Sequence, residues 1–315
     1  MSQAPQPVFT RIPCDICGTW DYTPVGRPRV GSDMESIVSI PEDICVARCT
    51  QCGFLYTQPM PFWRAEHLQQ IYGAAYFPKM TRWWERTKTR ANPRRRLNTV
   101  EGLTGSGPVR FLEVGCGLGY GIEDAMRRGW TVNGQDVSRF FAGEVQSRLG
   151  VDVFVGPLAE AGYPSSSFDV VYVDSVLEHL PQPMEMLREV RRILKPGGVA
   201  YLTVTNEDAL IARFRASLGR LTRSKRSPAL SPLDYPVHLV GFTPFTLRLA
   251  CEGAGFEVAS MLLLAGPNEW RKYGLSDAGK LLSHLTCYPV YVAGEWLGKA
   301  IAIEAVVVAR EEGPN

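Results

Sequence analysis

The chain has 315 residues, of which 45% are hydrophobic and 21% charged, and its formal net charge is +2. This length accommodates one large domain with a small accessory unit, and the composition is that of an ordinary globular protein with a full core. Because the net charge is small, the electrostatic field of the whole protein does not indicate a particular class of partner.

The N-terminal residues 1–13 lack the basic and apolar stretches of a secretory signal. The longest apolar run, residues 300–309, is interrupted by Glu304. It is also shorter than the roughly 18 apolar residues that span a bilayer. We therefore expect a cytoplasmic protein with no transmembrane segment.

Two Cys-x-x-Cys-Gly turns stand near the N-terminus, Cys14 with Cys17 and Cys49 with Cys52. Each turn can bring two thiolates onto one ion, and two turns complete a tetrahedral four-sulfur site. We predict a closed, structural Zn²⁺ site in a zinc-ribbon domain covering residues 1–60. Cys45 is a bystander in this interpretation, and a substitute ligand is the alternative for it. The alternatives are two chance reduced pairs or a redox dithiol.

Residues 61–104 are aromatic and basic with a mostly helical pattern, and we expect a helical linker or cap there. Its basic residues are Arg82, Arg86, Lys88, Arg90, Arg94, Arg95 and Arg96. Together with Trp83 and Trp84 they could touch nucleic acid or a membrane surface. Aromatic residues at helical spacing more often belong to a core.

Short apolar runs alternate with helical patterns after residue 109. The predicted strands are 110–114, 131–136, 152–155, 170–174, 199–205, 256–265 and 300–310. The predicted helices lie near 121–129, 138–149 and 183–194. This alternation is typical of an α/β domain whose parallel sheet is covered on both faces.

A loop with glycine at every second position, Gly115 to Gly119, follows the strand at 110–114. Glycine permits positive φ and a close approach of the backbone to a ligand at the start of a helix. Asp136 ends the next strand, at about the 20-residue offset where a carboxylate can bind ribose hydroxyls. Glu113 opposes a dinucleotide, because an acid there would face a pyrophosphate, and it suits a cationic ammonium or sulfonium end. The alternative is that Glu113 caps the helix.

The chain resembles the class I S-adenosylmethionine-dependent methyltransferases, especially the small-molecule enzymes related to those of quinone biosynthesis. The resemblance rests on the glycine loop and on Phe-Asp-Val-Val at 168–171, Asp-Ser-Val-Leu-Glu-His-Leu at 174–180, Leu-Lys-Pro-Gly-Gly at 194–198, His-Leu-Val-Gly-Phe-Thr-Pro at 238–244 and Gly-Ala-Gly-Phe at 253–256. It covers roughly residues 105–265. It implies a Rossmann-like, seven-stranded, mostly parallel sheet with an antiparallel last strand, in a methyltransferase domain covering residues 105–315.

The resemblance also implies a set of donor-binding residues. They are Glu113, Gly115, Cys116, Gly117, Gly119, Asp136, Val137, Leu158, Asp174 and Ser175. Leu158 or Ala159 would contribute in place of the Asp that the family often has after the glycine, because this chain has Pro157 there. For Asp174 and Ser175 the alternative is helix capping.

Methyl transfer from a sulfonium requires positioning and, for a hydroxyl acceptor, removal of a proton. His179 follows the fourth strand of the domain, and we take it as the first candidate base; a structural, hydrogen-bonded histidine is the alternative. His238, in the segment that the resemblance places over the acceptor, is the second candidate.

Residues 206–245 are expected to form a lid over the acceptor, and residues 266–299 a helical insert. The basic cluster from Arg213 to Arg226 suits an anionic acceptor. The apolar insert suits a cover over the pocket, a contact with a lipid-like acceptor or a dimer contact. A solvated face is the alternative for the basic cluster.

Three functions follow from these patterns. The first is a small-molecule methyltransferase acting on oxygen, with no nucleic acid as partner. The second is a carbon or nitrogen methyltransferase of a nucleotide-linked sugar. The third is an RNA methyltransferase that uses the zinc ribbon to bind RNA; against it, the segment 174–179 is not the Asn/Asp-Pro-Pro-Tyr type used on base amines.

Overall fold

The computed structural model describes residues 6–31, 38–74, 91–104, 107–214, 230–234, 237–264 and 288–310. Several expectations lie outside these residues: Arg82 to Arg90 with both tryptophans, the basic cluster from residue 215 onward, and the insert up to residue 287. Residues 288–296, at the end of the expected insert, are helical.

A seven-stranded sheet with the order β12-β13-β10-β9-β6-β7-β8 forms the centre of the large domain. Its strands are β6 (Arg110–Val114), β7 (Thr131–Asp136), β8 (Val153–Val155), β9 (Phe168–Asp174), β10 (Leu194–Thr205), β12 (Phe256–Leu264) and β13 (Ala302–Ala309). The strands from β10 to β8 are parallel, and β13 runs antiparallel to both of its neighbours. The predicted mixed α/β sheet with an antiparallel last strand is confirmed.

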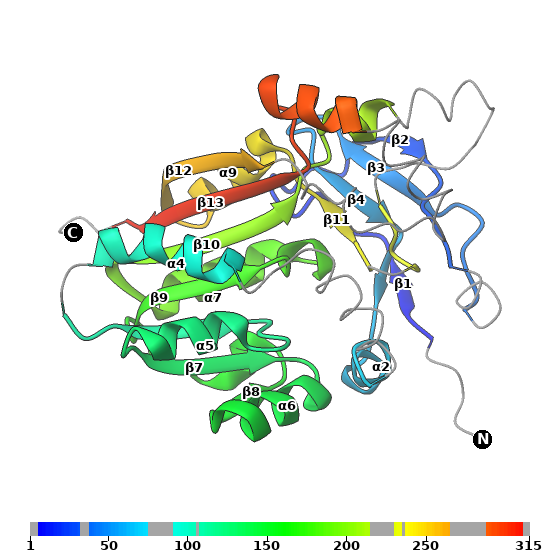
Figure 1. Cartoon of the computed structure of the whole chain (residues 1–315). Coiled ribbons are helices and arrows are strands. Elements are labelled where there is room, and N and C mark those ends of the chain that lie inside the picture. Colours follow the sequence, from blue (N-terminus) through cyan, green and yellow to red (C-terminus); the bar gives the residue numbers. More distant parts are fainter. Residues whose placement is uncertain are drawn as a thin grey trace, which may run out of the picture.

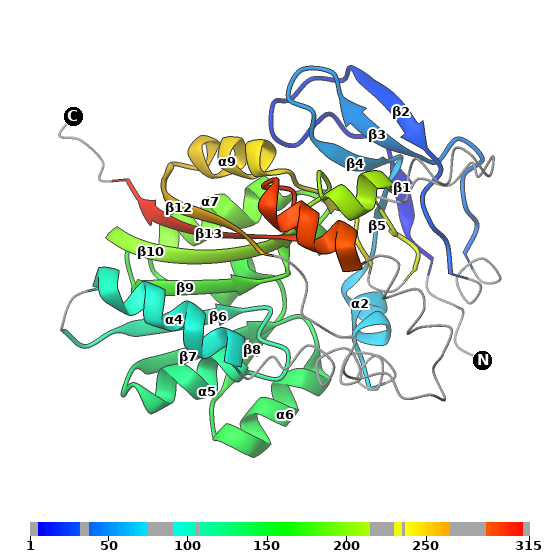
Figure 2. The same cartoon turned by 45° about the horizontal axis from the view of Figure 1, so that its top comes forward.

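Helices cover both faces of this sheet (Figures 1 and 2). One face carries α4 (Ala91–Thr104), α5 (Tyr120–Arg127) and α6 (Arg139–Leu149). The other carries α7 (Pro183–Ile193) and α9 (Pro244–Gly253). The central strand β9 shows why: its apolar side chains on both faces are buried, and each face therefore needs a covering layer.

A second, smaller sheet lies beyond one end of the large one (Figure 1). Its order is β11-β4-β3-β2, from β2 (Tyr22–Gly26), β3 (Cys45–Cys49), β4 (Leu55–Gln58) and β11 (Val240–Gly241). Beside it, β1 (Val8–Thr10) pairs with β5 (Met60–Phe62). We call the described residues from β1 to β5 the cysteine unit. Its sheet takes a fourth strand from residues 240–241, so the unit is joined to the large domain by strand pairing.

The helix α2 (Ala65–Ile71) follows the cysteine unit directly. Among the described residues no helix combines the length and the apolar character that crossing a membrane requires.

Candidate functional site

The glycine loop between β6 and α5 has a backbone that only glycine adopts readily. Gly115, Gly117 and Gly119 have φ of 62°, 49° and 65°, in the left-handed region. A Cβ on Gly115 would lie 2.5 Å from Cγ2 of Val176, and one on Gly119 would lie 2.9 Å from Cγ2 of Val145. The glycines therefore allow the loop to pass close to the segment that follows β9 and to helix α6.

Glu113 lies at the end of β6 and caps helix α5. Its Oε2 accepts the N–H of Ile122 at 2.8 Å, and its Oε1 accepts that of Gly121 at 3.3 Å. Burial raises the pKa of this carboxyl group to about 8, against the lowering effect of these backbone donors. The capping role that we considered as the alternative is therefore present. A direct contact with the amino-acid end of a donor stays a prediction.

Asp136, at the end of β7, ties the glycine loop to the next helix. Its Oδ2 accepts the N–H of Gly117 at 2.8 Å and its Oδ1 that of Ser138 at 2.8 Å. Burial raises the pKa of Asp136 to about 6. The neighbouring Gln135, which the sequence analysis did not single out, accepts the N–H of Gly115 at 3.2 Å through its side-chain oxygen.

Helix α2 lies against the residues that follow Asp136. The side-chain amide of Gln69 donates to the carbonyl of Val137 and accepts the N–H of Arg139 at 2.9 Å. The hydroxyl of Ser138 donates to the carbonyl of Tyr72 at 2.7 Å. The segment just after the cysteine unit thus borders this edge of the sheet.

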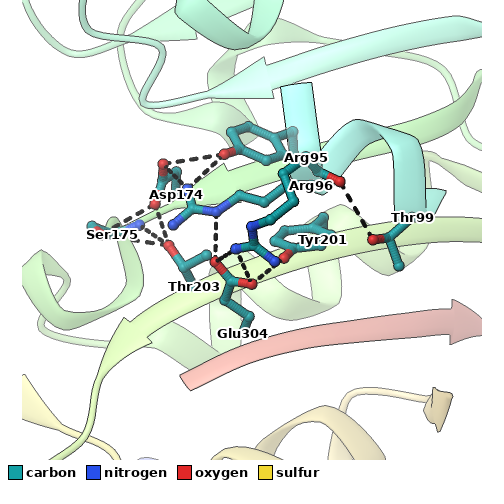
Figure 3. Close-up of polar contacts among 9 residues, drawn as sticks. Arg95, Arg96, Thr99, Asp174, Ser175, Tyr201, Thr203 and Glu304 are labelled. Carbon is teal, nitrogen blue, oxygen red and sulfur yellow. Dashed lines mark hydrogen bonds and ion pairs between the residues drawn. The ribbon is translucent and has the colours of Figure 1, made fainter. Parts of the chain in front are cut away.

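A buried ionic network links Asp174, at the end of β9, to helix α4 (Figure 3). The guanidinium of Arg96 donates through Nη1 to the Asp174 carboxylate and through Nε to Oε1 of Glu304 at 2.7 Å. Tyr201 donates its hydroxyl to Glu304 at 2.6 Å, and Arg95 also contacts this carboxylate at 2.6 Å. Burial acts to raise the pKa of Glu304, but these donors hold it below its usual value.

Ser175 follows Asp174 with a left-handed φ of 56°, and its N–H donates to the carbonyl and the hydroxyl of Thr203 on β10. Thr203 in turn donates its hydroxyl to Asp174. Asp174 therefore has an ion-pair partner in Arg96 and three hydroxyl donors, those of Thr203, Tyr172 and Ser175. These contacts differ from the helix capping that the sequence offered as the alternative.

Two histidines come together beyond the end of β9. Nδ1 of His179 lies 2.6 Å from the carbonyl oxygen of Val237, and the His179 and His238 ring centroids are 5.0 Å apart. A carbonyl only accepts, so Nδ1 carries the proton and Nε2 keeps its lone pair. Burial lowers the pKa of His179 to about 4 and that of His238 to about 3, so both rings are neutral near pH 7.

The neighbouring Glu178 is fully buried. Its Oε1 accepts the N–H of Thr205 at 3.2 Å, while its Oε2 has no hydrogen-bond partner among the described residues. Burial raises the pKa of Glu178 to about 7. The sequence pattern alone gives no role for this carboxyl group.

The four cysteines of the two Cys-x-x-Cys turns meet in the cysteine unit. Their sulfur atoms all lie within 4.8 Å of one another, with Cys14 and Cys52 at 3.5 Å and Cys17 and Cys49 at 3.4 Å. Sulfurs about 2.3 Å from one zinc ion in a tetrahedron stand roughly 3.8 Å apart, so the donor set fits this ion. Burial acts to raise the pKa of Cys49, but the N–H of Cys52 and other hydrogen-bond donors lower it to about 7, which favours the thiolate.

Three further residues were predicted to bind the methyl donor, and they lie in the glycine loop, after β7 and after β8. Cys116 is buried within the glycine loop, where its N–H donates to the carbonyl of Gln135 at 3.0 Å. Leu158 is buried in a short 3-10 helix, Leu158–Ala161, after β8. Val137 is half-buried next to Asp136.

Arg96 and Glu304 are members of the network that sequence reasoning missed. The sequence grouped Arg96 with basic residues that could touch nucleic acid or a membrane surface, whereas in the structure it is largely buried. The available signal was Glu304 itself, a lone acid in an apolar strand that must find a partner when buried.

Comparison with known proteins agrees with this arrangement. Residues 112–202 match the family model described as "Methyltransferase domain". The chain is 30% identical over 213 residues to the ubiquinone biosynthesis O-methyltransferase of Paracidovorax citrulli, covering 62% of this chain and 84% of that protein. The corresponding protein of Azoarcus sp. is 29% identical over 191 residues, covering 57% of this chain and 79% of the relative.

Among solved structures, a SAM-dependent methyltransferase from Archaeoglobus fulgidus is similar in fold, with a TM-score of 0.50 at 17% identity, over 73% of this chain and 99% of that chain. The fold and the family match define an α/β enzyme that uses S-adenosylmethionine as methyl donor. The chain belongs to the class I S-adenosylmethionine-dependent methyltransferases.

Proposed function

We propose that this methyltransferase acts on a hydroxyl oxygen of a small-molecule acceptor, with His179 as the base that removes the proton. The observation that carries the proposal is the contact between Nδ1 of His179 and the Val237 carbonyl. It fixes the ring with the proton on Nδ1 and the lone pair on Nε2, and the lowered pKa keeps that ring neutral near pH 7. His238, whose ring contacts that of His179, would help to orient it or the acceptor.

For the donor we propose the glycine loop from Gly115 to Gly119 as the floor and Asp136 as the partner of the ribose hydroxyls. Val137 and Leu158 would border the adenine. When bound, the donor supplies an electrophilic methyl group on a sulfonium. The chain's own residues orient the two substrates, exclude water and accept the proton at Nε2 of His179.

The amino-acid end of the donor carries one ammonium and one carboxylate group. We propose Asp174 with Ser175 for the ammonium side and Arg96 for the carboxylate, because an acid and a guanidinium already meet there at the end of β9. The buried Glu113 would act mainly through helix α5, whose first N–H groups it holds. The pair of opposite charges complements a zwitterion better than either group alone.

For the four cysteines we propose a structural zinc ion, because the four sulfur atoms fill the donor set of a closed tetrahedral site. We also retain residues 1–60 as a zinc-ribbon domain, 61–104 as a helical linker and 105–315 as the methyltransferase domain. Residues 206–245 would cover the acceptor, and their part 240–241 is already paired with the cysteine unit.

The function is tested by incubating the chain with methyl-labelled S-adenosylmethionine and a panel of phenols, catechols, amines and nucleotide-linked sugars. We expect label on an oxygen of a hydroxylated acceptor, and at least a hundredfold loss in His179→Asn. Label on nitrogen or carbon, or on RNA added as a further acceptor, would replace the proposal with one of the alternatives. Asp169→Asn serves as a control, since this residue contacts Lys195 and the N–H of Arg110 away from the site.

A further inference from the structure

The segment that carries His179 runs from the end of β9 to the start of α7, and the first cysteine turn contacts the start of α7. Asp15, which stands between Cys14 and Cys17, accepts the N–H of Met184 through Oδ2 at 2.8 Å. Met184 lies in the first turn of α7, and the helix's own N-cap residue, Gln182, makes no side-chain capping bond. A free N–H at a buried helix start is costly, so Asp15 supplies the missing cap from a different part of the chain.

The second cysteine turn leads into strand β4, which contacts the segment of residues 237–239 beside His179. Cys49 and Cys52 form the turn between β3 and β4, where the N–H of Cys49 donates to the carbonyl of Phe54 at 2.9 Å. Farther along β4, both the N–H and the hydroxyl of Thr57 donate to the carbonyl of Leu239 at 3.0 Å.

Leu239 and Val237 connect Thr57 to the Glu178–His179 pair. The N–H of Leu239 donates to the carbonyl of Glu178 at 2.8 Å, and the carbonyl of Val237, two residues earlier, accepts Nδ1 of His179. The 237–239 segment therefore lies between Thr57 on one side and the Glu178–His179 pair on the other. On the donor side, the N–H groups of Gly117 and Ile122 instead donate to Asp136 and Glu113, which belong to the large sheet itself.

We propose that Asp15 and Thr57 are positioning residues through which the cysteine unit sets the orientation and the tautomer of the His179 ring. They act on the acceptor side and leave the donor side unaffected. Neither residue touches a reacting atom: Asp15 fixes the start of α7 after His179, and Thr57 fixes the carbonyl-bearing segment that bonds Nδ1. The consequence for catalysis rests on the proposed role of His179 as base, but the positioning itself does not.

The experiment uses the zinc-loaded full chain labelled with ¹⁵N in the histidine rings. The chain has four histidines, so the signals can be assigned by substituting each one. Thr57→Val keeps the shape of the side chain and removes the hydroxyl, Thr57→Ser keeps the hydroxyl, and Asp15→Ala removes the cap. Thr50→Val is the matched control, because its hydroxyl donates to the carbonyl of Asp21 within the same unit but away from residue 239.

We expect wild type, Thr57→Ser and Thr50→Val to show His179 as the single Nδ1–H tautomer. Thr57→Val and Asp15→Ala should show a mixture of tautomers, with affinity for S-adenosylhomocysteine by calorimetry within twofold of wild type. A single Nδ1–H tautomer in both of these variants would overturn the proposal, and so would a tenfold loss of S-adenosylhomocysteine affinity in them. If His179→Asn retains full turnover, the proposed base is wrong, yet the tautomer result still decides whether the two residues position the ring.

Discussion

Arg96 pairs with Asp174 inside the protein, although one residue lies in a helix before the large sheet begins and the other ends its fourth strand along the chain. The same guanidinium reaches Glu304 on the last strand, so one side chain joins α4, β9 and β13. This contact is shared by the proposed donor site and the core.

Replacing Arg96 by Met should lower stability as well as donor affinity. The substitution leaves the carboxylate of Asp174 without its arginine partner and removes one of the two arginines that contact Glu304, which keeps Arg95. Breaking a buried pair in this way costs about 3–5 kcal/mol. Urea denaturation measures the loss. The control Arg127→Met removes an exposed pair with Glu123, worth about 0–1 kcal/mol. Equal unfolding free energies for the two variants would contradict a structural role for Arg96.

Donor affinity should fall as the pH is lowered through about 6. Burial raises the pKa of Asp136 to about 6, and only its ionised form accepts hydrogen bonds from both ribose hydroxyls. Above this pH the carboxylate is charged and binding is strongest; below it the protonated group loses acceptor capacity. Calorimetric titration with S-adenosylhomocysteine between pH 5 and 8 measures the effect. Asp136→Asn should bind weakly with no such step, and a step that persists in this variant would assign it to another group.

His179 should make the folded protein sensitive to acid over a defined window. Its folded pKa of about 4 lies below the unfolded value near 6.5, so the unfolded chain binds more protons between these values. The contribution of His179 to the free energy of unfolding is therefore complete above about pH 6.5, and it is lost as the pH falls toward 4. The variant His179→Asn should show a smaller decrease than wild type in urea titrations at pH 7 and pH 5. An identical decrease would mean that the ring is not buried as a neutral group.

Replacing Cys49 by Ser should lower the zinc content of the protein, whereas replacing Cys45 should not. Cys49 belongs to the four-sulfur cluster, whereas Cys45, at the start of the same strand, does not. Elemental analysis should find one zinc per chain in wild type and in Cys45→Ser, and much less in Cys49→Ser. The Cys49 variant should also melt at a lower temperature, because a closed zinc site contributes to folding directly. Equal zinc content in both serine variants would exclude the assigned cluster.

The strands of the large sheet could be predicted from the sequence because short apolar runs and the turn residues between them mark each strand locally. The apolar runs at 110–114 and 131–136 became β6 and β7 with the bounds expected, and the glycines between them have the positive φ that their spacing indicated. Strand β10 starts earlier than expected, at Leu194, because Leu194 already pairs with Phe168 of β9; the register then shifts between Leu194 and Val199, where Gly197 has a φ of 72°. The four cysteines also met as predicted, because each pair is set by a short turn.

Contacts between distant segments could not be predicted in the same way. Nothing local in Thr57 or Leu239 indicates that β4 pairs with β11, since backbone pairing leaves no mark on residue type. Arg96 resembled the exposed arginines around it, because a charged residue on a helix gives no sign of which face is buried until the helix is packed. Asp15 likewise resembled a turn residue, and its role as the cap of α7 depends on the tertiary fold.

The most direct test of the account is a crystal structure of the chain with S-adenosylhomocysteine. The account predicts that the ligand lies over the loop from Gly115 to Gly119, with ribose hydroxyls on the carboxylate of Asp136 and its sulfur on the side of His179. A ligand whose ribose has no contact with Asp136, or that lies away from the glycine loop, would contradict it.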